Sequence, residues 1–269
     1  MRLAVQEQLL PGRTLQARWE TALAWGFEAI ELRGAGGHAF RERLPELRAA
    51  RRDGVVMTTV CVDMDHFIGD FDAARRADAV ANMADQLAVI GELGGVGAMT
   101  PAAWGMFSRR LPPFTPPRSA DSDREVLLDA LCRLGTIAAR EGVVVLLEPL
   151  NRYEDHMVNT VAQAAGLARA TGLPSVLVGA DTYHMNIEEA DPLAALRSDA
   201  DRLGHVQLSD SNRLEPGAGH LDFGALLRCL QSIGYDGDLA FECRLSGEPA
   251  RVLPRATAML RSGLGLVAA

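Results

Sequence analysis

The sequence VVVLLEPLNRYE, at Val143–Glu154, is the clearest indication of the architecture of this chain. Its apolar run, Val143–Leu147, has the length and composition of a buried strand, and it ends directly at Glu148. A second acid, Glu154, follows in the same segment. An acid at a strand end is most often simply exposed or caps the next helix, because most charged residues lie in solvent. Whether Glu148 has that ordinary role or a functional one depends on which residues stand at the ends of the other predicted strands.

Further apolar runs recur along the chain and alternate with helical patterns. The helical segments, such as TLQARWETALAWG and DFGALLRCLQSIG, open on Thr, Ser or Asp and close on Gly, which are typical helix start and stop residues. A strand followed each time by a helical crossover predicts parallel pairing. The predicted strands are Leu3–Gln6, Ala29–Leu32, Val56–Val62, Val96–Met99, Val143–Leu147, Val176–Gly179, His205–Leu208 and Leu239–Glu242.

Eight such units are the number that closes a (β/α)8 TIM barrel, and the 269 residues are close to the roughly 250 typical of one. We therefore predict an α/β fold in which residues 1–269 form one barrel domain. The proline-rich segment RRLPPFTPPRSADSD, at Arg109–Asp123, is interpreted as one long βα loop that forms a lid or wall of the active site.

A doubly wound dinucleotide-binding fold is the alternative, because GAGGHA at Gly34–Ala39 fits the pattern G-x-G-x-x-A. However, this segment follows the second predicted strand and does not open the first βαβ unit. The acid about 20 residues further on, Asp53, lies in a turn before the next strand. The sequence therefore favours an ordinary glycine loop.

The composition limits the classes of partner. A formal charge of −8, from 27 basic and 35 acidic residues, argues against nucleic acid as the main partner. The four cysteines show no CxxC spacing, which favours a reducing compartment. No segment reaches the roughly 18 uninterrupted apolar residues that would span a bilayer, and no cleavable leader is evident. We expect a cytoplasmic protein with no membrane partner.

Polar side chains stand at the ends of four consecutive predicted strands: Glu148, Asp181, Gln207 and Glu242. In a barrel these positions converge at the carboxyl-terminal mouth, where barrel enzymes carry their chemistry. Without a cation, three carboxylates gathered there would repel one another and shift their pKa values upward. Oxygen ligands of this kind suit Mg²⁺ or Mn²⁺, with Co²⁺ also compatible. The sequence therefore predicts a divalent metal site formed by these residues.

The chain resembles the xylose isomerase-like barrel superfamily, in particular ketose 3-epimerases and hydroxypyruvate isomerases. The resemblance rests on four segments in order: LEPLNRYE (147–154), GADTYHMNIEE (179–189), GHVQLSDSNRLEPGAGHLDF (204–223) and LAFECR (239–244). It implies a sugar isomerase or epimerase whose metal ligands are Glu148, Asp181, Gln207 and Glu242. The epimerases usually have histidine at the position of Gln207, whereas hydroxypyruvate isomerases can use glutamine. This departure weakens the case for Zn²⁺ as the metal and leaves an oxygen ligand for a hard cation.

The resemblance also implies that Glu154, His184 and Arg213 bind the substrate. Each residue has an ordinary alternative: Glu154 can pair with Arg152, His184 can be a buried strand-end histidine, and Arg213 can cover a loop. His205 shares a strand face with Gln207, and a packed structural role is favoured for it.

Two further aromatic residues, Phe67 and Trp104, are candidate wall residues of the active site, with burial as the alternative. His38 and His156 receive no role.

The predicted chemistry is proton abstraction next to a carbonyl. A divalent ion that chelates a substrate carbonyl and the neighbouring hydroxyl acidifies the carbon-bound proton and stabilises the enediolate that follows. Glu148 and Glu242 are the predicted catalytic bases. If they act on opposite faces of one carbon they epimerise it, whereas one glutamate that moves the proton between adjacent carbons gives aldose–ketose isomerisation.

Other functions remain open on sequence alone. A metal-dependent lyase or dehydratase acting on a keto sugar or keto-inositol would begin with the same proton abstraction. A non-catalytic sugar-binding protein would need no pair of bases. An apurinic-site endonuclease is disfavoured by the acidic balance and by the small number of histidines. The sequence leaves open whether the chain forms a homo-oligomer, such as a dimer or tetramer.

Overall fold

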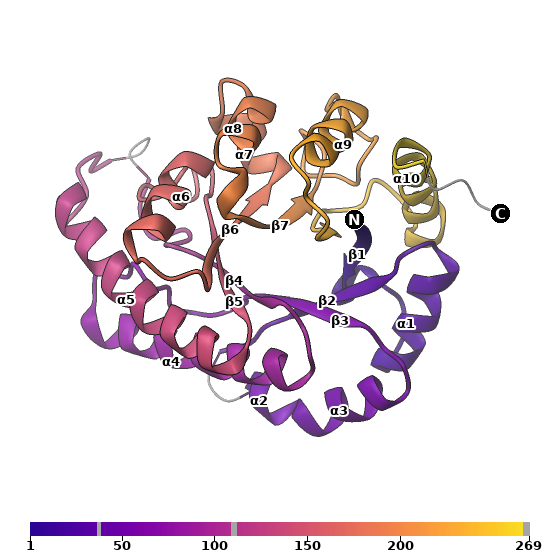
Figure 1. The fold of residues 1–269 in the computed structure, drawn as a ribbon, viewed down its shortest axis with the longest axis horizontal. Helices are drawn as coiled ribbons and strands as arrows, with labels where there is room; N and C mark the ends of the chain where they lie inside the picture. The colour runs from indigo at the N-terminus through magenta and orange to yellow at the C-terminus, as the bar shows by residue number, and fades with distance from the viewer. Residues whose placement is uncertain (37–38, 109–111, 266–269) are drawn as a thin grey trace.

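Eight parallel strands close into a barrel in the computed structural model of the chain, which describes residues 1–36, 39–108 and 112–265. Each strand pairs with its neighbours in sequence, and β8 returns to β1. Figure 1 shows the helices arranged around this central ring of strands. The predicted (β/α)8 barrel is confirmed, and the doubly wound alternative is excluded because the sheet is closed.

The strands are β1 (Arg2–Gln6), β2 (Ala29–Arg33), β3 (Met57–Cys61), β4 (Gly97–Pro101), β5 (Val144–Glu148), β6 (Val176–Asp181), β7 (Leu203–Leu208) and β8 (Asp238–Phe241). The helices are α1 (Leu15–Ala24), α2 (Ala39–Glu42), α3 (Leu44–Arg52), α4 (Ala73–Glu92), α5 (Ala120–Glu141), α6 (Val161–Ala170), α7 (Thr182–Glu188), α8 (Pro192–Ser198), α9 (Phe223–Ser232) and α10 (Pro249–Gly263), with short 3-10 turns η1 (Glu7–Leu9) and η2 (Ala200–Arg202).

All eight predicted strands are present, with differences at their ends. The strand β4 continues to Pro101, because Pro101 lies opposite Glu148 on β5. The strand β6 continues to Asp181, which lies opposite Gln207 on β7. Glu242, predicted to be the last residue of its strand, follows β8 directly. These pairings bring the predicted strand-end residues to one edge of the barrel.

Side-chain caps start most of the long helices, as the sequence predicts. Thr160 accepts a hydrogen bond from the backbone N–H of Gln163, and the Gln163 side chain completes a capping box. Asp222 caps α9 through the N–H of Ala225. The helix α5 begins at Ala120 and is capped by Ser119, whose side chain accepts a hydrogen bond from the N–H of Ser122.

Two predicted loops lie only partly within the described residues. Gly37 and His38 of the glycine-rich segment, and residues 109–111 of the proline-rich segment, lie outside them. Residues 112–119 of the proline-rich segment lie in the connection from β4 to α5, as predicted, whereas its last four residues, Ala120–Asp123, belong to α5.

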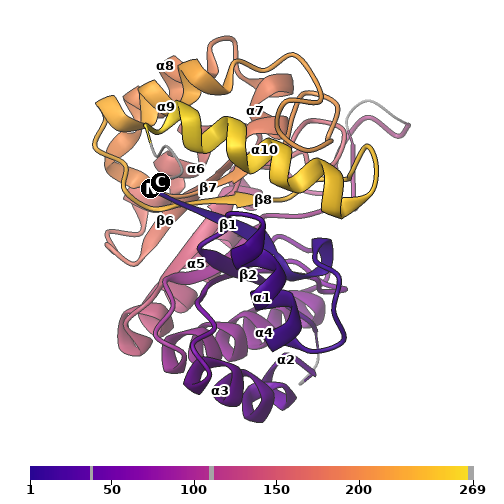
Figure 2. The same ribbon diagram turned by 90° about the vertical axis from the view of Figure 1, so that its right-hand side faces the viewer.

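The last helix completes the outer layer of the barrel. Figure 2 shows α10 lying beside α9 on the side of the barrel where β8 meets β1. The Thr257 hydroxyl of α10 donates a hydrogen bond to the carbonyl of Trp25 at the end of α1, at 2.6 Å. Inside this seam, the rings of Phe27 and Phe241 pack edge to face with centroids 5.0 Å apart. Among the described residues, no helix combines the length and hydropathy needed to cross a bilayer.

We expect the Gly97→Ala substitution to destabilise the barrel by about 1–3 kcal/mol, the usual range for overpacking. A methyl group on Gly97 would lie 2.2 Å from the backbone oxygen of Val144 in the neighbouring strand. The matched control is Gly166→Ala in α6, where an added methyl group meets no described atom within 4 Å. This control should stabilise the protein by about 0.5–1 kcal/mol, because alanine costs less backbone entropy in a helix. Denaturant unfolding measures both, and equal effects would contradict the assigned register of β4 and β5.

Candidate active site

A cavity of about 310 Å³ opens at the carboxyl ends of the strands. Its walls contain most of the residues singled out from the sequence. Phe67 and Trp104 both line it, with ring centroids 6.4 Å apart. The lining residues are Arg33, Cys61, Val62, Asp63, Met64, Phe67, Pro101, Trp104, Glu148, Leu150, Glu154, His184, Arg213 and Glu242.

Three acids predicted to bind metal lie close together, and two of them, Glu148 and Glu242, line this cavity. Glu148 ends β5 and Asp181 ends β6, and both are buried. One possible ligand atom from each of Glu148, Asp181 and His184 lies within 4.8 Å of the others. Glu242 joins them through Arg213, whose Nη2 lies 3.0 Å from Glu242 Oε2. The structure therefore brings the predicted carboxylates together as strand-end neighbours.

The two carboxylate oxygens of Asp181 have different hydrogen-bond partners. Oδ1 accepts hydrogen bonds from the backbone N–H groups of Tyr183 and His184, at 2.7 and 3.3 Å, and so caps α7. Oδ2 faces Arg213 Nη1 at 2.5 Å. Burial opposes ionisation of this carboxyl, but the charge of Arg213 and its hydrogen bond outweigh burial and lower the pKa of Asp181. Asp181 is therefore a fixed negative charge.

The pKa values of Glu148 and Glu242 are shifted in the opposite direction to that of Asp181. Burial raises the pKa of Glu148 well above its ordinary value, and the charges of Glu242 and Asp181 raise it further. Burial also raises the pKa of Glu242 to about 8, although Arg213 opposes that shift. These two carboxyl groups therefore hold protons readily at neutral pH unless a cation is placed beside them.

Gln207 supplies the fourth oxygen of the predicted set. It is fully buried and lies opposite Asp181 across the β6–β7 pairing. Its Nε2 donates a hydrogen bond to Glu31 Oε1 at 2.8 Å, whereas its Oε1 receives none from the described part of the chain. A buried acceptor without a donor is costly, and a cation beside it removes the cost. Three carboxylates and this amide oxygen fit a hard divalent ion such as Mg²⁺ or Mn²⁺.

His184 has the geometry of a hydrogen-bond donor. Its Nδ1 accepts the backbone N–H of Asn151 at 3.0 Å, so the neutral ring carries its proton on Nε2. This Nε2 lies 3.7 Å from Glu148 Oε1. Burial lowers the pKa of His184 and keeps the ring neutral, despite the nearby charge of Asp181. An N–H that points at the acids suits the binding of a substrate oxygen better than the binding of a metal.

Glu154 is held at the rim of the cavity. Its Oε1 accepts a hydrogen bond from Asn151 Nδ2 at 2.8 Å, and its Oε2 accepts one from Trp104 Nε1 at 3.0 Å. The alternative partner, Arg152, instead pairs with Glu188 at 2.7 Å. The Glu154 carboxylate is therefore positioned at the cavity wall by Asn151 and Trp104.

Arg213 is oriented by a rigid loop. Its φ of 62° lies in the left-handed region, which is uncommon for a residue with a side chain. The backbone of the loop is held by Asp210, which accepts hydrogen bonds from the N–H groups of Ser211, Gly217 and Leu221. The guanidinium carbon lies 5.0 Å from the ring centroid of Tyr183. Arg213 therefore does more than cover a loop, because it is fixed against both Asp181 and Glu242.

Sequence reasoning missed three residues that organise this site. Asn151 orients His184 and Glu154, and Asp210 shapes the loop of Arg213. Glu31 holds Gln207 and also lies 2.8 Å from His205 Nε2. A signal was available for Glu31 only, because a charged residue inside the predicted buried strand Ala29–Leu32 is unusual.

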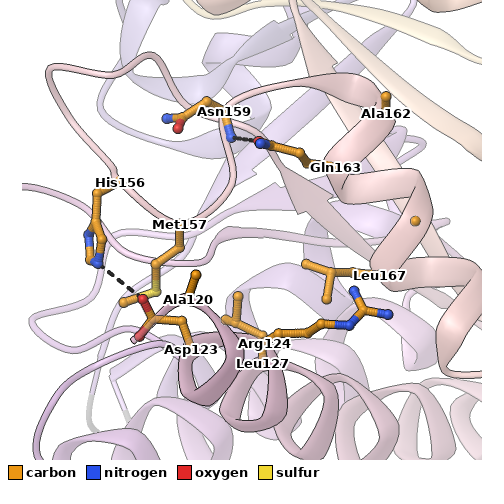
Figure 3. Close-up of a pocket in the computed structure, with 11 residues that line it drawn as sticks. Ala120, Asp123, Arg124, Leu127, His156, Met157, Asn159, Ala162, Gln163 and Leu167 are labelled. Carbon is orange, nitrogen blue, oxygen red and sulfur yellow. Dashed lines mark hydrogen bonds and ion pairs between the residues drawn. The ribbon is translucent and has the colours of Figure 1, made fainter. Parts of the chain in front are cut away.

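A second cavity, of about 380 Å³, lies outside the barrel mouth between α5 and α6 (Figure 3). His156, which received no role from the sequence, lines it, and its Nε2 lies 3.3 Å from Asp123 Oδ2. Asp123 is also paired with Arg118, at 2.5 Å. None of the residues predicted to bind metal or substrate lines this cavity, so its greater size does not make it the candidate active site.

Comparisons with known proteins agree on the architecture. The family model described as xylose isomerase-like TIM barrel matches residues 19–263. The chain is 40% identical over 264 residues to the 3-dehydro-D-guloside 4-epimerase of Escherichia coli (strain K12), covering 97% of this chain and 100% of that protein. It is 32% identical over 237 residues to a D-psicose 3-epimerase of Enterocloster bolteae, covering 81% of this chain and 73% of that protein.

Solved structures give the same result. The apo crystal structure of a 3-keto-D-glucoside 4-epimerase from E. coli matches with a TM-score of 0.91 and 39% identity, over 97% of this chain and 99% of that chain. An L-ribulose 3-epimerase matches with a TM-score of 0.83 and 25% identity, over 98% and 94% of the two chains. The similarity therefore extends over nearly the whole barrel.

We expect the Glu242→Gln variant to gain stability relative to the wild type as pH rises from 5 to 8, with a chelator present. The folded pKa of Glu242, about 8, lies above its ordinary value of 4.5. An acid with a raised folded pKa loses stability as pH rises between those two values, because the unfolded chain ionises first. Glutamine does not titrate, so the difference in melting temperature should widen over this range. A pH-independent difference would contradict the assigned environment of Glu242.

Proposed function

The chain belongs to the xylose isomerase-like TIM barrel family, and on that premise we propose that it is a divalent-metal-dependent sugar epimerase. The reaction is inversion of a carbon that neighbours a keto group. The observation that carries the proposal is the pair of glutamates at the cavity, the buried Glu148 and the partly buried Glu242, whose raised pKa values suit the exchange of protons near neutral pH.

The proposed metal ligands are Glu148, Asp181, Gln207 and Glu242. Asp181 contributes a permanent charge, and Gln207 contributes the buried oxygen that receives no hydrogen bond from the described residues. A divalent ion held there polarises the substrate carbonyl and stabilises negative charge on its oxygen. His184 is not included, because its Nε2 carries a proton.

The two glutamates are proposed to move the proton. They leave β5 and β8, which are separated in the closed barrel by β6 and β7, so their carboxyl groups approach the cavity from different sides. One glutamate removes the proton from the carbon next to the carbonyl, and the other delivers a proton to the opposite face. These two proton transfers invert the carbon, and the total number of protons on Glu148 and Glu242 stays the same.

Three other side chains are proposed to orient the substrate. The guanidinium of Arg213 and the Nε2–H of His184 donate hydrogen bonds to substrate oxygens near the reacting carbon. The Glu154 carboxylate, held by Asn151 and Trp104, accepts a hydrogen bond from a sugar hydroxyl further out. Together they fix which carbon lies between the two glutamates.

We propose a keto sugar within a glycoside as the substrate class. The E. coli relative that is similar over its whole length is named a 3-dehydro-D-guloside 4-epimerase, and in such a compound the inverted carbon neighbours the keto group. The cavity also extends past the acids to Arg33, Asp63 and Trp104, which leaves a polar and aromatic wall for the remainder of a glycoside. Free ketoses, the substrates in the names of other relatives, are the alternative that a substrate panel distinguishes.

Turnover should disappear on chelation and return with Mn²⁺, Mg²⁺ or Co²⁺, because the bound ion would supply the polarisation of the substrate carbonyl. The Gln207→Leu variant should bind these ions more weakly, and Gln207→His should retain binding and shift preference toward softer ions such as Zn²⁺. Isothermal titration measures each affinity. Full turnover in chelated protein, or unchanged affinity in the leucine variant, would contradict the metal assignment.

We expect Glu148→Gln and Glu242→Gln each to lower turnover of a keto sugar by about 10²–10⁴-fold, the usual contribution of a general base. In D₂O, the variant that retains the base for proton removal should still exchange the substrate proton for deuterium without inverting the carbon. The other variant should lose exchange and inversion together. NMR reports both events, with bound metal checked in each sample.

The matched control is Glu215→Gln, which alters a buried glutamate that binds Ser246 away from the cavity wall. It should leave turnover near that of the wild type. Deuterium that migrates to a neighbouring carbon would indicate isomerisation, and elimination products would indicate a lyase. Near wild-type turnover in both metal-loaded glutamine variants would overturn the catalytic assignment.

A further inference from the structure

We propose that Glu31 is the positioning residue of the metal site, because it fixes the side-chain amide of Gln207 with the oxygen turned toward the metal. This inference rests on the proposed function, since it concerns a ligand of the proposed ion. Glu31 lies in β2 and is completely buried in the barrel interior, and it is not among the residues that line the cavity.

Both oxygens of Glu31 are fully used by donors. Oε1 accepts hydrogen bonds from Gln207 Nε2 at 2.8 Å and from Gln6 Nε2 at 3.0 Å. Oε2 accepts one from the Thr59 hydroxyl at 2.7 Å and lies 2.8 Å from His205 Nε2. A carboxylate offers about four lone-pair sites, and four donors occupy them here. Glu31 therefore has no free position with which to bind a metal or act as a base.

The orientation of Gln207 follows from the chemistry of its partner. An ionised carboxylate only accepts hydrogen bonds, so the atom of Gln207 that faces Glu31 has to be the NH₂ nitrogen. The other atom, Oε1, then points away from Glu31 and receives no hydrogen bond from the described residues. An amide turned the other way would place two acceptors against each other in the core, which is unfavourable.

The other partners of Glu31 are arranged as donors too. Gln6 Nε2 and the Thr59 hydroxyl donate hydrogen bonds to it, and His205 Nε2 lies 2.8 Å from its Oε2. With these groups around it, Glu31 acts as an acceptor on every side, and Gln207 has to present its NH₂ group as well.

The backbone is adapted to place this carboxylate. The pairing of β2 with β3 shifts register between Ile30 and Glu31, and such irregularities often redirect a side chain near a functional site. Gln6 and Thr59 lie directly opposite Glu31 on the two neighbouring strands. Gln207 and His205 reach it from β7, across the barrel interior. Side chains from three strands, β1, β3 and β7, therefore converge on one acid of β2 that does not line the cavity.

The test measures binding of Mn²⁺ alone to wild-type and variant protein by isothermal titration, with no substrate present. Glu31→Gln should weaken Mn²⁺ binding by about 10–100-fold, the usual cost of losing a partner that orients a metal ligand. The introduced amide can donate to Gln207 Oε1, which allows the Gln207 side chain to flip and present nitrogen to the ion. The control, Glu215→Gln, should keep the wild-type affinity.

A double-mutant cycle shows whether Glu31 acts through Gln207. In the Gln207→Leu background, adding Glu31→Gln should change Mn²⁺ affinity by less than about twofold, since the group being oriented has gone. Equal losses in both backgrounds would mean that Glu31 supports the site only by charge or packing, and would overturn the proposal.

The double variant Glu31→Gln/Gln207→Glu exchanges the acid and the amide. It keeps one carboxylate and one amide in contact, and so it remains informative if Glu31→Gln alone does not fold. It should fold and recover Mn²⁺ binding to within about tenfold of the wild type, because an oxygen again faces the ion. A folded exchange variant without Mn²⁺ binding would overturn the proposal.

The outcomes separate this inference from the proposed function. A wild-type protein that binds no Mn²⁺ would overturn the metal-dependent function together with the inference. A wild-type protein that binds Mn²⁺ with the same affinity as Glu31→Gln would overturn the inference alone.

Discussion

Negative charge buried inside a closed barrel is the constraint on which the rest of this structure depends. Ionised carboxyl groups are costly in a protein interior unless charges or hydrogen bonds compensate them. Glu31 is compensated by four donors and Asp181 by Arg213 and a helix start. Glu148 and Glu242 have less compensation, and their pKa values rise. The acids that are least well compensated are thus the ones suited to exchanging protons.

The fold could largely be predicted from the sequence because its signals are local. Apolar runs such as Val143–Leu147 and capping residues such as Thr160 depend on a few neighbouring positions. The exact strand ends could not be predicted, since they depend on pairing between distant segments. Pro101 and Asp181 belong to strands only because Glu148 and Gln207 lie opposite them. Local patterns do not contain that register.

The candidate site was predictable to the extent that topology determines it. Parallel strands bring their carboxyl ends to one edge, so residues at the ends of β5 to β8 had to meet. The roles of Asn151 and Glu31 were not predictable, because they arise from side-chain contacts across the barrel and between loops. Glu31 is far from Gln207 in sequence, and no spacing rule connects them. The orientation of an amide becomes visible only when its partners are in place.

The exposed indole at the cavity rim gives the protein an optical reporter of its own. Trp19 is buried and Trp25 is half-buried, whereas Trp104 is 57% exposed and bonded to Glu154. A collisional quencher in solution should therefore reach Trp104 before the other two indoles. A sugar that occupies the cavity would shield this ring. It would also compete with the Trp104 indole for hydrogen bonds to the Glu154 carboxylate. Occupancy of the cavity can thus be followed by fluorescence, independently of whether any product forms.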